Sequence, residues 1–261
     1  MDRHDADLER RFGGLRRLHG EAAYQHLRAA HFVVVGLGGV GSWAVEALAR
    51  SGAAALTLID LDQVSESNIN RQIQALGSTV GMAKAEALRL RIEDIHPGCA
   101  VRVIEEFVEP DNWPALLGGG EVDGLIDCCD QVRAKAVLAA WAREQGVPFV
   151  TVGAAGGKRE PHRVLLDDLS DTTHDPLLAS LRQRLRKFHG APRSGRMQVS
   201  CVYSRELVHL PPTDGEACDV DGSLNCHGYG SSVAVTATFG LCAAAELQRL
   251  HLVRREVVQK V

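Results

Sequence analysis

Residues 31–52 read HFVVVGLGGVGSWAVEALARSG, and this stretch decides the fold class. Residues 32–35 are rich in β-branched side chains and predict a strand, a glycine-rich turn follows, and the pattern up to Gly52 predicts an amphipathic helix. A second apolar run over 55–59 predicts another strand, which ends at Asp60. A strand, a helix and a strand in this order form a unit whose two strands lie parallel in one sheet.

The alternation of strands and helices continues to about residue 157. The apolar patterns predict helices over 84–95 and 133–145 and strands over 100–107, 122–126 and 149–152. We therefore predict an α/β fold, with a doubly wound, Rossmann-like, mostly parallel sheet and a C-terminal extension. Residues 1–157 are predicted to form a nucleotide-binding domain with N-terminal helices, and residues 158–261 an extension that packs on it and binds substrate.

The second half of the chain has a different pattern. It predicts a helix over 176–188, strands over 162–166, 199–203 and 207–210, and a long irregular segment over 211–230. The most apolar stretch, 231–247, carries Ser, Thr and Gly and holds Glu246 near its end. We interpret it as a buried helix, or a strand and a helix, rather than as a membrane span.

Composition excludes several classes of protein. The 261 residues include 29 Lys and Arg against 33 Asp and Glu, a net charge of −4, which excludes a wholly basic nucleic-acid binder but not a local basic patch. Seven cysteines, an odd number, and a charged start without an apolar run favour a reducing cytoplasm in which most thiols are free. No Cys-x-x-Cys pair is present, which argues against a paired zinc site.

The glycine-rich turn is the strongest functional signal. Glycines in such a turn let the backbone approach a phosphate, and the helix behind it directs its N-terminal N–H groups at the anion. An acid about 20 residues further on, at the end of the next strand, binds ribose hydroxyls in such folds, and Asp60 fits that place. We therefore predict a nucleotide site, with a purely structural turn as the alternative. The predicted phosphate-binding glycines are Gly36, Gly38, Gly39 and Gly41.

The residues after Asp60 indicate which nucleotide binds. The polar loop that follows holds Asn68, Arg71 and Gln72, and Lys84 begins the next predicted helix. Hydride transfer needs no such cations, whereas a triphosphate carries several negative charges that Arg and Lys neutralise. This favours ATP over a nicotinamide cofactor. The alternative for Arg71 alone is a solvated surface residue.

Two carboxylates follow the strand predicted over 122–126. Asp127 and Asp130 stand at a strand end, where ligands bind in parallel sheets, and one carboxylate together with substrate phosphates can hold Mg²⁺. The alternative is a cap for the helix that follows. We assign Asp130 to the metal, and for Asp127 the cap is the favoured interpretation.

These motifs together resemble the adenylating domain of ubiquitin-activating-like enzymes, which include activators of sulfur carriers in molybdopterin and thiamine synthesis. The resemblance rests on GLGGVGS (36–42), IDLD (59–62), SNINRQ (67–72), Lys84 three residues after a glycine, and DCCD (127–130), and spans about residues 10–155. It implies ATP, Mg²⁺, carboxylate adenylation and a homodimer or pseudodimer. Matching positions assign Asn68, Arg71 and Lys84 to the triphosphate, with Arg71, Lys84 and Asp130 as the catalytic set. The family often supplies an arginine from the partner's N-terminal helix, for which Arg11 and Arg17 are the candidates.

The second half resembles a subgroup of that family, the tRNA threonylcarbamoyladenosine dehydratases, through TVGAAGGKREPHRV (151–164), DPLLASLRQRLRKF (175–188) and VSCVYSRE (199–206). The subgroup implies ATP-dependent activation of the threonyl carboxylate of a modified adenosine in tRNA, after which loss of AMP closes a ring. The enzymatic alternative is a sulfur-carrier activator that adenylates a protein C-terminus, and the non-enzymatic one is a nucleotide-binding scaffold. A sulfur-transfer protein is a further expected partner.

A basic stretch agrees with a tRNA substrate. Residues 176–205 contain no Asp or Glu and seven Lys or Arg, and phosphate backbones bind such patches. A solvated helix face is the alternative. Cys201 lies in a predicted strand and is interpreted as a buried residue, with a persulfide role as the alternative, and 211–230 is a lid or a docking surface. The predicted tRNA-binding residues are Arg182, Arg186, Arg193 and Arg196.

Overall fold

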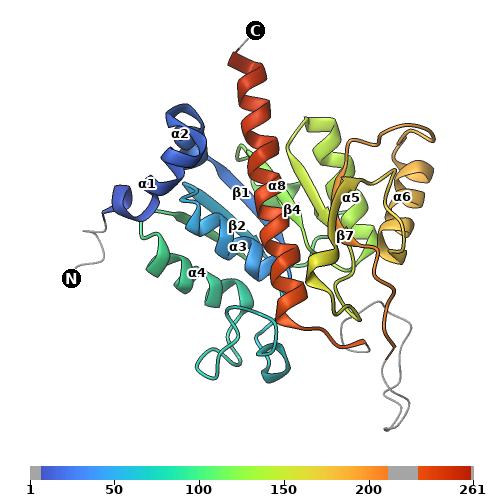
Figure 1. The fold of residues 1–261 in the computed structure, drawn as a ribbon, viewed down its shortest axis with the longest axis horizontal. Helices are drawn as coiled ribbons and strands as arrows, with labels where there is room; N and C mark the ends of the chain where they lie inside the picture. The colour runs from blue at the N-terminus through green and yellow to red at the C-terminus, as the bar shows by residue number, and fades with distance from the viewer. Residues whose placement is uncertain (1–6, 211–228, 260–261) are drawn as a thin grey trace.

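The computed structural model describes residues 7–210 and 229–259 of the chain (Figure 1). Within them the strands are β1 (His31–Val35), β2 (Ala55–Ile59), β3 (Ala100–Ile104), β4 (Gly124–Asp127), β5 (Phe149–Val152), β6 (Val164–Asp168) and β7 (Ser200–Ser204). The α-helices are α1 (Leu8–His19), α2 (Glu21–Ala29), α3 (Gly41–Arg50), α4 (Lys84–Ile95), α5 (Val132–Gln145), α6 (Pro176–Phe188) and α8 (Val233–Gln259). Short 3₁₀ turns are η2 (Glu66–Asn68), η3 (Ala115–Leu117) and η4 (Pro161–Arg163).

The strands form one sheet in the order β3-β2-β1-β4-β5-β7-β6. All neighbours pair in parallel except β6 and β7, which are antiparallel. Val35 is level with Ile59 on one side and with Asp127 on the other, so β1, β2 and β4 end together. The strand order reverses between β1 and β4, and ligands of such sheets bind in the crevice outside the carboxyl ends of the strands at this point. We call this side of the sheet the carboxyl edge.

Both faces of the sheet are buried because its strands alternate between two cores. Phe32 and Val34 of β1 pack with Leu48 of α3 and Phe239 of α8 in the first core. Val33 and Val35 point the other way and pack with residues of α5 and α6 in the second core. Successive side chains of a strand face opposite sides, so a run of apolar residues in β1 fills both layers. The result is a three-layer α/β arrangement, visible in Figure 1.

The long helix α8 crosses the first face of the sheet and begins beside the loop between β2 and α4, at the bottom of Figure 1. Two hydrogen bonds hold its beginning there: Asn70 Nδ2 donates to the Ser231 carbonyl at 2.9 Å, and Thr236 Oγ1 donates to the Arg71 carbonyl at 3.3 Å. The C-terminal half of the chain therefore forms part of the wall behind the glycine-rich turn.

The predicted fold class is confirmed, including the Rossmann-like order of the strands. Several predicted elements have the bounds that the structure shows, such as β2, α4 and α6, and the apolar stretch 231–247 belongs to the single helix α8 from Val233 onward. The strand predicted over 207–210 is wrong, because these residues follow β7 without pairing to the sheet. The sheet continues from β5 to β7, so no break between layers marks residue 157, and the division into two domains stays a prediction. Among the described residues, no helix is long and apolar enough to cross a membrane.

Candidate functional site

The glycine-rich turn lies directly on the loop between β4 and α5. Gly36 has a φ of 83°, and a Cβ on it would come within 2.8 Å of the carbonyl carbon of Cys128. A Cβ on Gly41 would overlap the carbonyl oxygen of Gly36. Neither position can hold a side chain without moving backbone. The N-cap of α3 is Val40, whose side chain makes no capping bond. The N–H groups of Ser42 and Trp43 donate to the carbonyls of Gly38 and Val40, which leaves the Gly41 N–H at the start of the helix for an anion.

Asp60 fastens the turn to the end of β2. Its Oδ2 accepts a hydrogen bond from the Leu37 backbone N–H at 2.6 Å, and its Oδ1 accepts one from the Asp62 N–H at 2.8 Å. Burial raises the pKa of Asp60, and the positive charge of Lys84 acts in the opposite direction. The carboxylate thus stands beside the turn at the carboxyl edge, as the prediction for a ribose-binding acid requires.

Lys84 begins α4, and its side chain lies near Asp60 at the carboxyl edge. Its Nζ donates to Asp62 Oδ2 at 2.7 Å, and its side chain is only 8% exposed, whereas that of Asp62 is 54% exposed. The backbone N–H of Lys84 also donates to the Asp62 carbonyl, at 3.0 Å. The ammonium group is therefore held at the edge of the site, with one of its three donors occupied by Asp62.

Arg71 and Gln72 lie against the glycine-rich turn. The Cδ of Arg71 is 3.4 Å from the place of a Cβ on Gly39, and the Nε2 of Gln72 is 4.0 Å from that of Gly38. The guanidinium of Arg71 donates through one nitrogen to the Ser67 carbonyl at 2.7 Å and to Asn70 Oδ1 at 2.9 Å.

Asn68 contributes to the shape of the same loop. It is buried and closes a capping box with Ser65: its Oδ1 accepts from the Ser65 N–H, and the Ser65 side chain accepts from the backbone of Asn68. The structure therefore makes Asn68 a shaping residue of this loop, and phosphate binding by it stays a prediction.

Two buried polar atoms beside the turn have no hydrogen-bond partner among the described residues: the hydroxyl of Ser42 and Oε1 of Gln74. Gln74 donates through Nε2 to the Leu37 carbonyl at 2.9 Å, so it touches the turn directly. Buried polar atoms are normally paired, so these two atoms are candidates for contact with a bound water, ion or ligand. Gln74 is not among the predicted site residues, because no sequence motif distinguishes it from its neighbours.

The two aspartates after β4 have different environments. Asp127 is fully buried and pairs with Lys135 of α5, Nζ to Oδ2 at 3.0 Å. Asp130 is exposed at the carboxyl edge. Neither carboxylate caps α5, because the N-cap of this helix is Gln131 and it makes no side-chain cap bond. The capping alternative therefore fails for both residues. Asp130 is an exposed carboxylate one residue after Cys129, whose backbone lies against Gly36, and this fits its assignment to a metal.

No group of three or more Cys, His, Asp or Glu within residues 7–210 and 229–259 could hold a metal ion alone. A Mg²⁺ ion in a nucleotide site needs only one or two protein carboxylates, because phosphates and water complete the coordination. Asp130 can supply one such carboxylate.

The predicted tRNA-binding residues lie elsewhere. Helix α6 begins at the carboxyl edge, since the Ala154 N–H after β5 donates to its N-cap Asp175 at 2.9 Å, and α6 then runs toward the opposite edge. Arg182 is part-buried and donates to the carbonyls of Leu169 and Thr172, each at 2.9 Å. The side chain of Arg196 is 79% exposed and lies 3.9 Å from Asp168.

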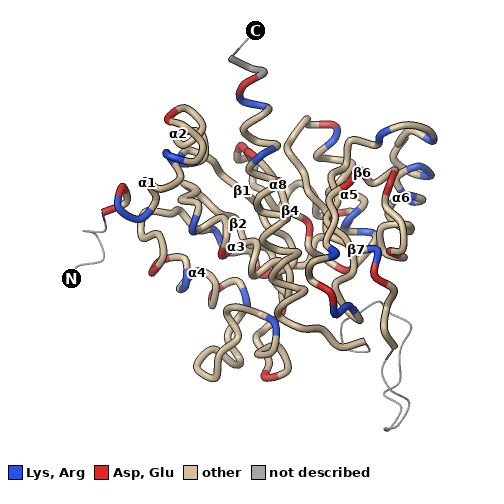
Figure 2. Tube along the Cα trace, in the orientation of Figure 1, with Lys and Arg blue, Asp and Glu red and all other residues tan. Residues whose placement is uncertain are grey.

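Figure 2 shows this group of cations beside α6, at the right of the molecule and away from the start of α8. Arg186 donates to the Pro192 carbonyl at 3.2 Å, whereas Arg193 is exposed. The structure thus separates this basic stretch from the carboxyl edge. Two of the four predicted arginines are bonded to backbone carbonyls, and Arg193 and Arg196 are the more exposed pair.

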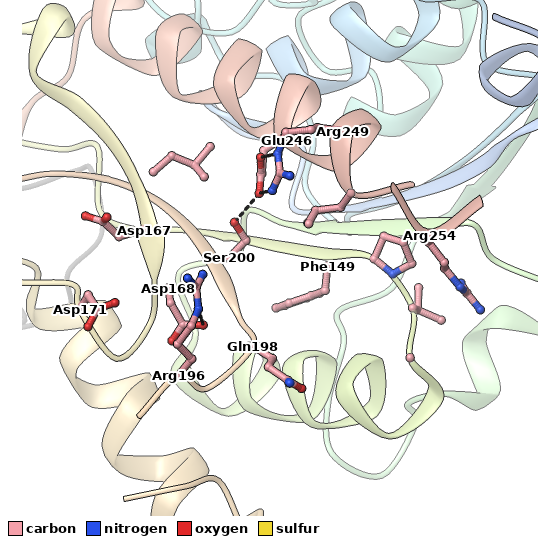
Figure 3. A pocket seen from close by; sticks show the side chains of 15 residues that line it. Phe149, Asp167, Asp168, Asp171, Arg196, Gln198, Ser200, Glu246, Arg249 and Arg254 are labelled. Carbon is pink, nitrogen blue, oxygen red and sulfur yellow. Dashed lines mark hydrogen bonds and ion pairs between the residues drawn. The ribbon is translucent and has the colours of Figure 1, made fainter. Parts of the chain in front are cut away.

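A cavity of about 460 Å³ opens at the edge opposite the glycine-rich turn (Figure 3). It lies between the beginnings of β5 and β7, the end of β6 and the later turns of α8, and its wall includes Phe149, Arg196 and Arg249. On its floor the Ser200 hydroxyl donates to Glu246, which also pairs with Arg249. None of the residues predicted to bind ATP lines this cavity. The groups predicted to bind ATP instead converge at the carboxyl edge, which makes that edge the candidate nucleotide site.

The remaining predicted groups are placed as follows. The five cysteines of the described residues are free thiols, and Cys201 is fully buried in β7, where burial raises its pKa well above the usual value. Arg11 donates to the carbonyls of Asp94 and Ile95 of its own chain, both at 2.7 Å, and Arg17 is exposed. Cys218, Cys226 and most of the segment 211–230 lie outside the described residues.

Comparisons with known proteins identify relatives of this chain. The chain is 46% identical over 244 residues to the tRNA threonylcarbamoyladenosine dehydratase of Escherichia coli K12, which covers 90% of this chain and 91% of the relative. It is 40% identical over 244 residues to the protein of the same name from Haemophilus influenzae, covering 92% and 93%. A solved structure of the E. coli enzyme, TcdA, in complex with ATP matches with a TM-score of 0.86 and 42% identity, covering 96% of this chain and 98% of that one.

The motif-based resemblance is thereby confirmed. A family model described as the ThiF family matches residues 10–258, almost the whole chain. The strand order, the glycine-rich turn and the polar groups at the carboxyl edge all lie within this match. The chain belongs to the ThiF family.

Proposed function

We propose that this chain is an ATP-dependent tRNA threonylcarbamoyladenosine dehydratase, which cyclises the modified adenosine through an adenylated carboxylate. The observation that carries the proposal is the convergence of Asp60, Arg71 and Lys84 on the glycine-rich turn. Relatives of this name align with about nine tenths of the chain, including its second half. An acid for the ribose and two cations for the phosphates are the groups that ATP requires.

Adenylation needs positioning and charge neutralisation more than acid or base catalysis. A carboxylate oxygen attacks the α-phosphorus of ATP, and pyrophosphate leaves with its bonding electrons. An atom of the same substituent then attacks the activated carboxyl carbon, AMP leaves with one former carboxylate oxygen, and a proton is released. The net change in the tRNA is the loss of the elements of one water. The Gly41 N–H at the start of α3, together with Arg71 and Lys84, would stabilise the negative charge that develops on the phosphates.

We assign Mg²⁺ to Asp130, which is exposed beside the turn. The ion would shield the phosphates when bound, with phosphate oxygens and water in its other positions. Gln72 and Gln74 line the approach to the turn, and the unpaired Oε1 of Gln74 offers a hydrogen-bond acceptor to a bound nucleotide.

We further propose a cytoplasmic homodimer. Arg11 is occupied by α4 of its own chain, which leaves Arg17 as the arginine that a partner's site would receive. Arg193 and Arg196 remain the best exposed candidates for tRNA phosphates among the four that we assigned. A sulfur-transfer partner stays a prediction, and the burial of Cys201 gives no support to a persulfide on that residue.

Mass spectrometry of tRNA nucleosides tests the function. The purified chain is incubated with threonylcarbamoyl-modified tRNA, ATP and Mg²⁺, and we expect an ATP-dependent product that is lighter by one water. Arg71→Ala should abolish most of the product, whereas Arg50→Ala, an arginine paired with Glu46 away from the site, should not.

A tRNA that stays unchanged in this assay would refute the proposal. Pyrophosphate release that instead depends on a small protein ending in Gly-Gly would identify a sulfur-carrier activator. ATP binding without any pyrophosphate release would identify a scaffold.

A further inference from the structure

Three fully buried polar side chains meet beneath the carboxyl edge, and none of them belongs to the predicted site. Asp127 ends β4, Lys135 lies one helical turn into α5, and Thr151 lies on β5. Asp127 Oδ2 accepts from Lys135 Nζ at 3.0 Å and from the Thr151 hydroxyl at 2.6 Å. Lys135 Nζ also lies 3.0 Å from the Thr151 hydroxyl, so the three groups form a closed network.

The network holds a charged pair. Burial is the largest effect and lowers the pKa of Lys135, but the charge of Asp127, its hydrogen bond and the two neighbouring thiols together raise that pKa overall, so the lysine is charged. Removing two charges from water is expensive, and apolar residues of similar volume often replace such a pair at no loss of stability. Stability is therefore a weak explanation for the presence of this ion pair, and its geometry indicates a different role.

The second oxygen of Asp127 shapes the turn that follows. Oδ1 accepts from the backbone N–H of Cys129 at 3.1 Å and from its thiol at 2.6 Å, which bends the chain directly after β4. The Cys128 N–H donates to the Val35 carbonyl at 2.8 Å, and the backbone of Cys128 lies against Gly36. The next residue after this bend is Asp130.

We propose that Asp127 is a positioning residue for the adenylation site. Lys135 and Thr151 hold Oδ2, so that Oδ1 stays fixed and sets the turn at Cys129. The turn presents the Asp130 carboxylate to the metal–nucleotide complex beside the glycine-rich turn. This inference rests on the proposed function and on Mg²⁺ at Asp130.

Two double variants separate positioning from folding. Asp127→Leu with Lys135→Met removes both charges and the acceptor at Oδ1. Asp127→Asn with Lys135→Met also removes both charges, but its amide oxygen can still accept from the Cys129 N–H. Calorimetry measures the affinity for ATP with and without Mg²⁺, and thermal unfolding measures stability. A second ion pair, Glu46 with Arg91 between α3 and α4, gives the control Glu46→Leu with Arg91→Met.

We expect the leucine variant to lose about tenfold or more of the Mg²⁺-dependent gain in ATP affinity, the effect typical of losing a residue that orients a metal ligand. The asparagine variant should retain most of that gain, and the Glu46 control should retain all of it. Equal gains in the leucine variant and the wild type would overturn the proposal, as would equal losses in both Asp127 variants.

If the leucine variant does not fold, Thr151→Val tests the proposal instead, because it removes one hydrogen-bond donor to Asp127 Oδ2 and leaves both charges. A fall in the Mg²⁺-dependent gain supports the proposal, and an unchanged gain overturns it. Failure of the proposed function has a different signature, namely wild-type protein that binds ATP with Mg²⁺ but does not change the tRNA.

Discussion

Replacing Lys84 with methionine tests whether this lysine acts on the nucleotide or only on Asp62. Methionine keeps the length and apolar volume of the buried stem and removes the ammonium. If Lys84 stabilises charge on the phosphates, its loss should lower the rate of adenylation about 10²–10³-fold, or about 3–4 kcal/mol. If its only role is the ion pair with Asp62, the loss is small, because that acid is 54% exposed. Such pairs contribute at most about 1 kcal/mol, or about fivefold.

The matched variant is Asp62→Asn, which breaks the same pair from the other side and leaves the lysine in place. Single-turnover release of pyrophosphate from ATP, at saturating modified tRNA, measures the adenylation step, and urea unfolding checks the fold. We expect Lys84→Met to lower the rate at least tenfold more than Asp62→Asn does. Equal effects of the two variants would refute the reasoning and reduce Lys84 to a structural partner of Asp62.

Three further predictions concern the metal, the tRNA and pH. Asp130→Asn should raise the Mg²⁺ concentration needed for half-maximal turnover, because the amide keeps an oxygen but loses the charge; an unchanged Mg²⁺ titration would remove Asp130 from the metal site. Arg193→Gln with Arg196→Gln should flatten the slope of log tRNA affinity against log salt by about one and a half to two. Arg182→Gln should lower stability and leave that slope unchanged, because the guanidinium of Arg182 donates to backbone carbonyls. Burial and the nearby arginines lower the pKa of His96 to about 4 from 6.5. The unfolded chain therefore takes up a proton first, and stability is lost as the pH falls from about 6.5 toward 4. In urea unfolding, the wild type should lose about 2 kcal/mol more than His96→Gln between pH 7 and pH 5, and equal losses would contradict this prediction.

The sequence predicted the fold class because its evidence is local. A β-branched run, a glycine-rich turn and an amphipathic helix each act over a few residues, and parallel strands connected by helices follow a small set of rules. The same rules place the ends of parallel strands at one edge, so Asp60 and Lys84 could be expected near the turn before any coordinates.

The wrong element and the limits of the site prediction have the opposite cause. Residues 207–210 have the apolar character of a strand, but a strand needs a neighbour to pair with, and no pattern in the sequence says whether one is in reach. The same holds for the basic stretch, where the charges are visible in the sequence but the carbonyls of Leu169 and Thr172 that bind Arg182 are supplied by another segment.

By itself, the sequence determined the doubly wound sheet, the glycine-rich turn and the residue types of a triphosphate site. Tertiary structure alone decided that Asp127 is a buried partner of Lys135 and Thr151 while Asp130 is exposed, although both acids stand in one four-residue motif. It also decided that α8 closes the wall behind the turn and that α6 carries its arginines away from the carboxyl edge. Periodicity and spacing report on contacts along one segment, whereas burial, charge pairing and edge placement depend on segments that meet only when the sheet has formed.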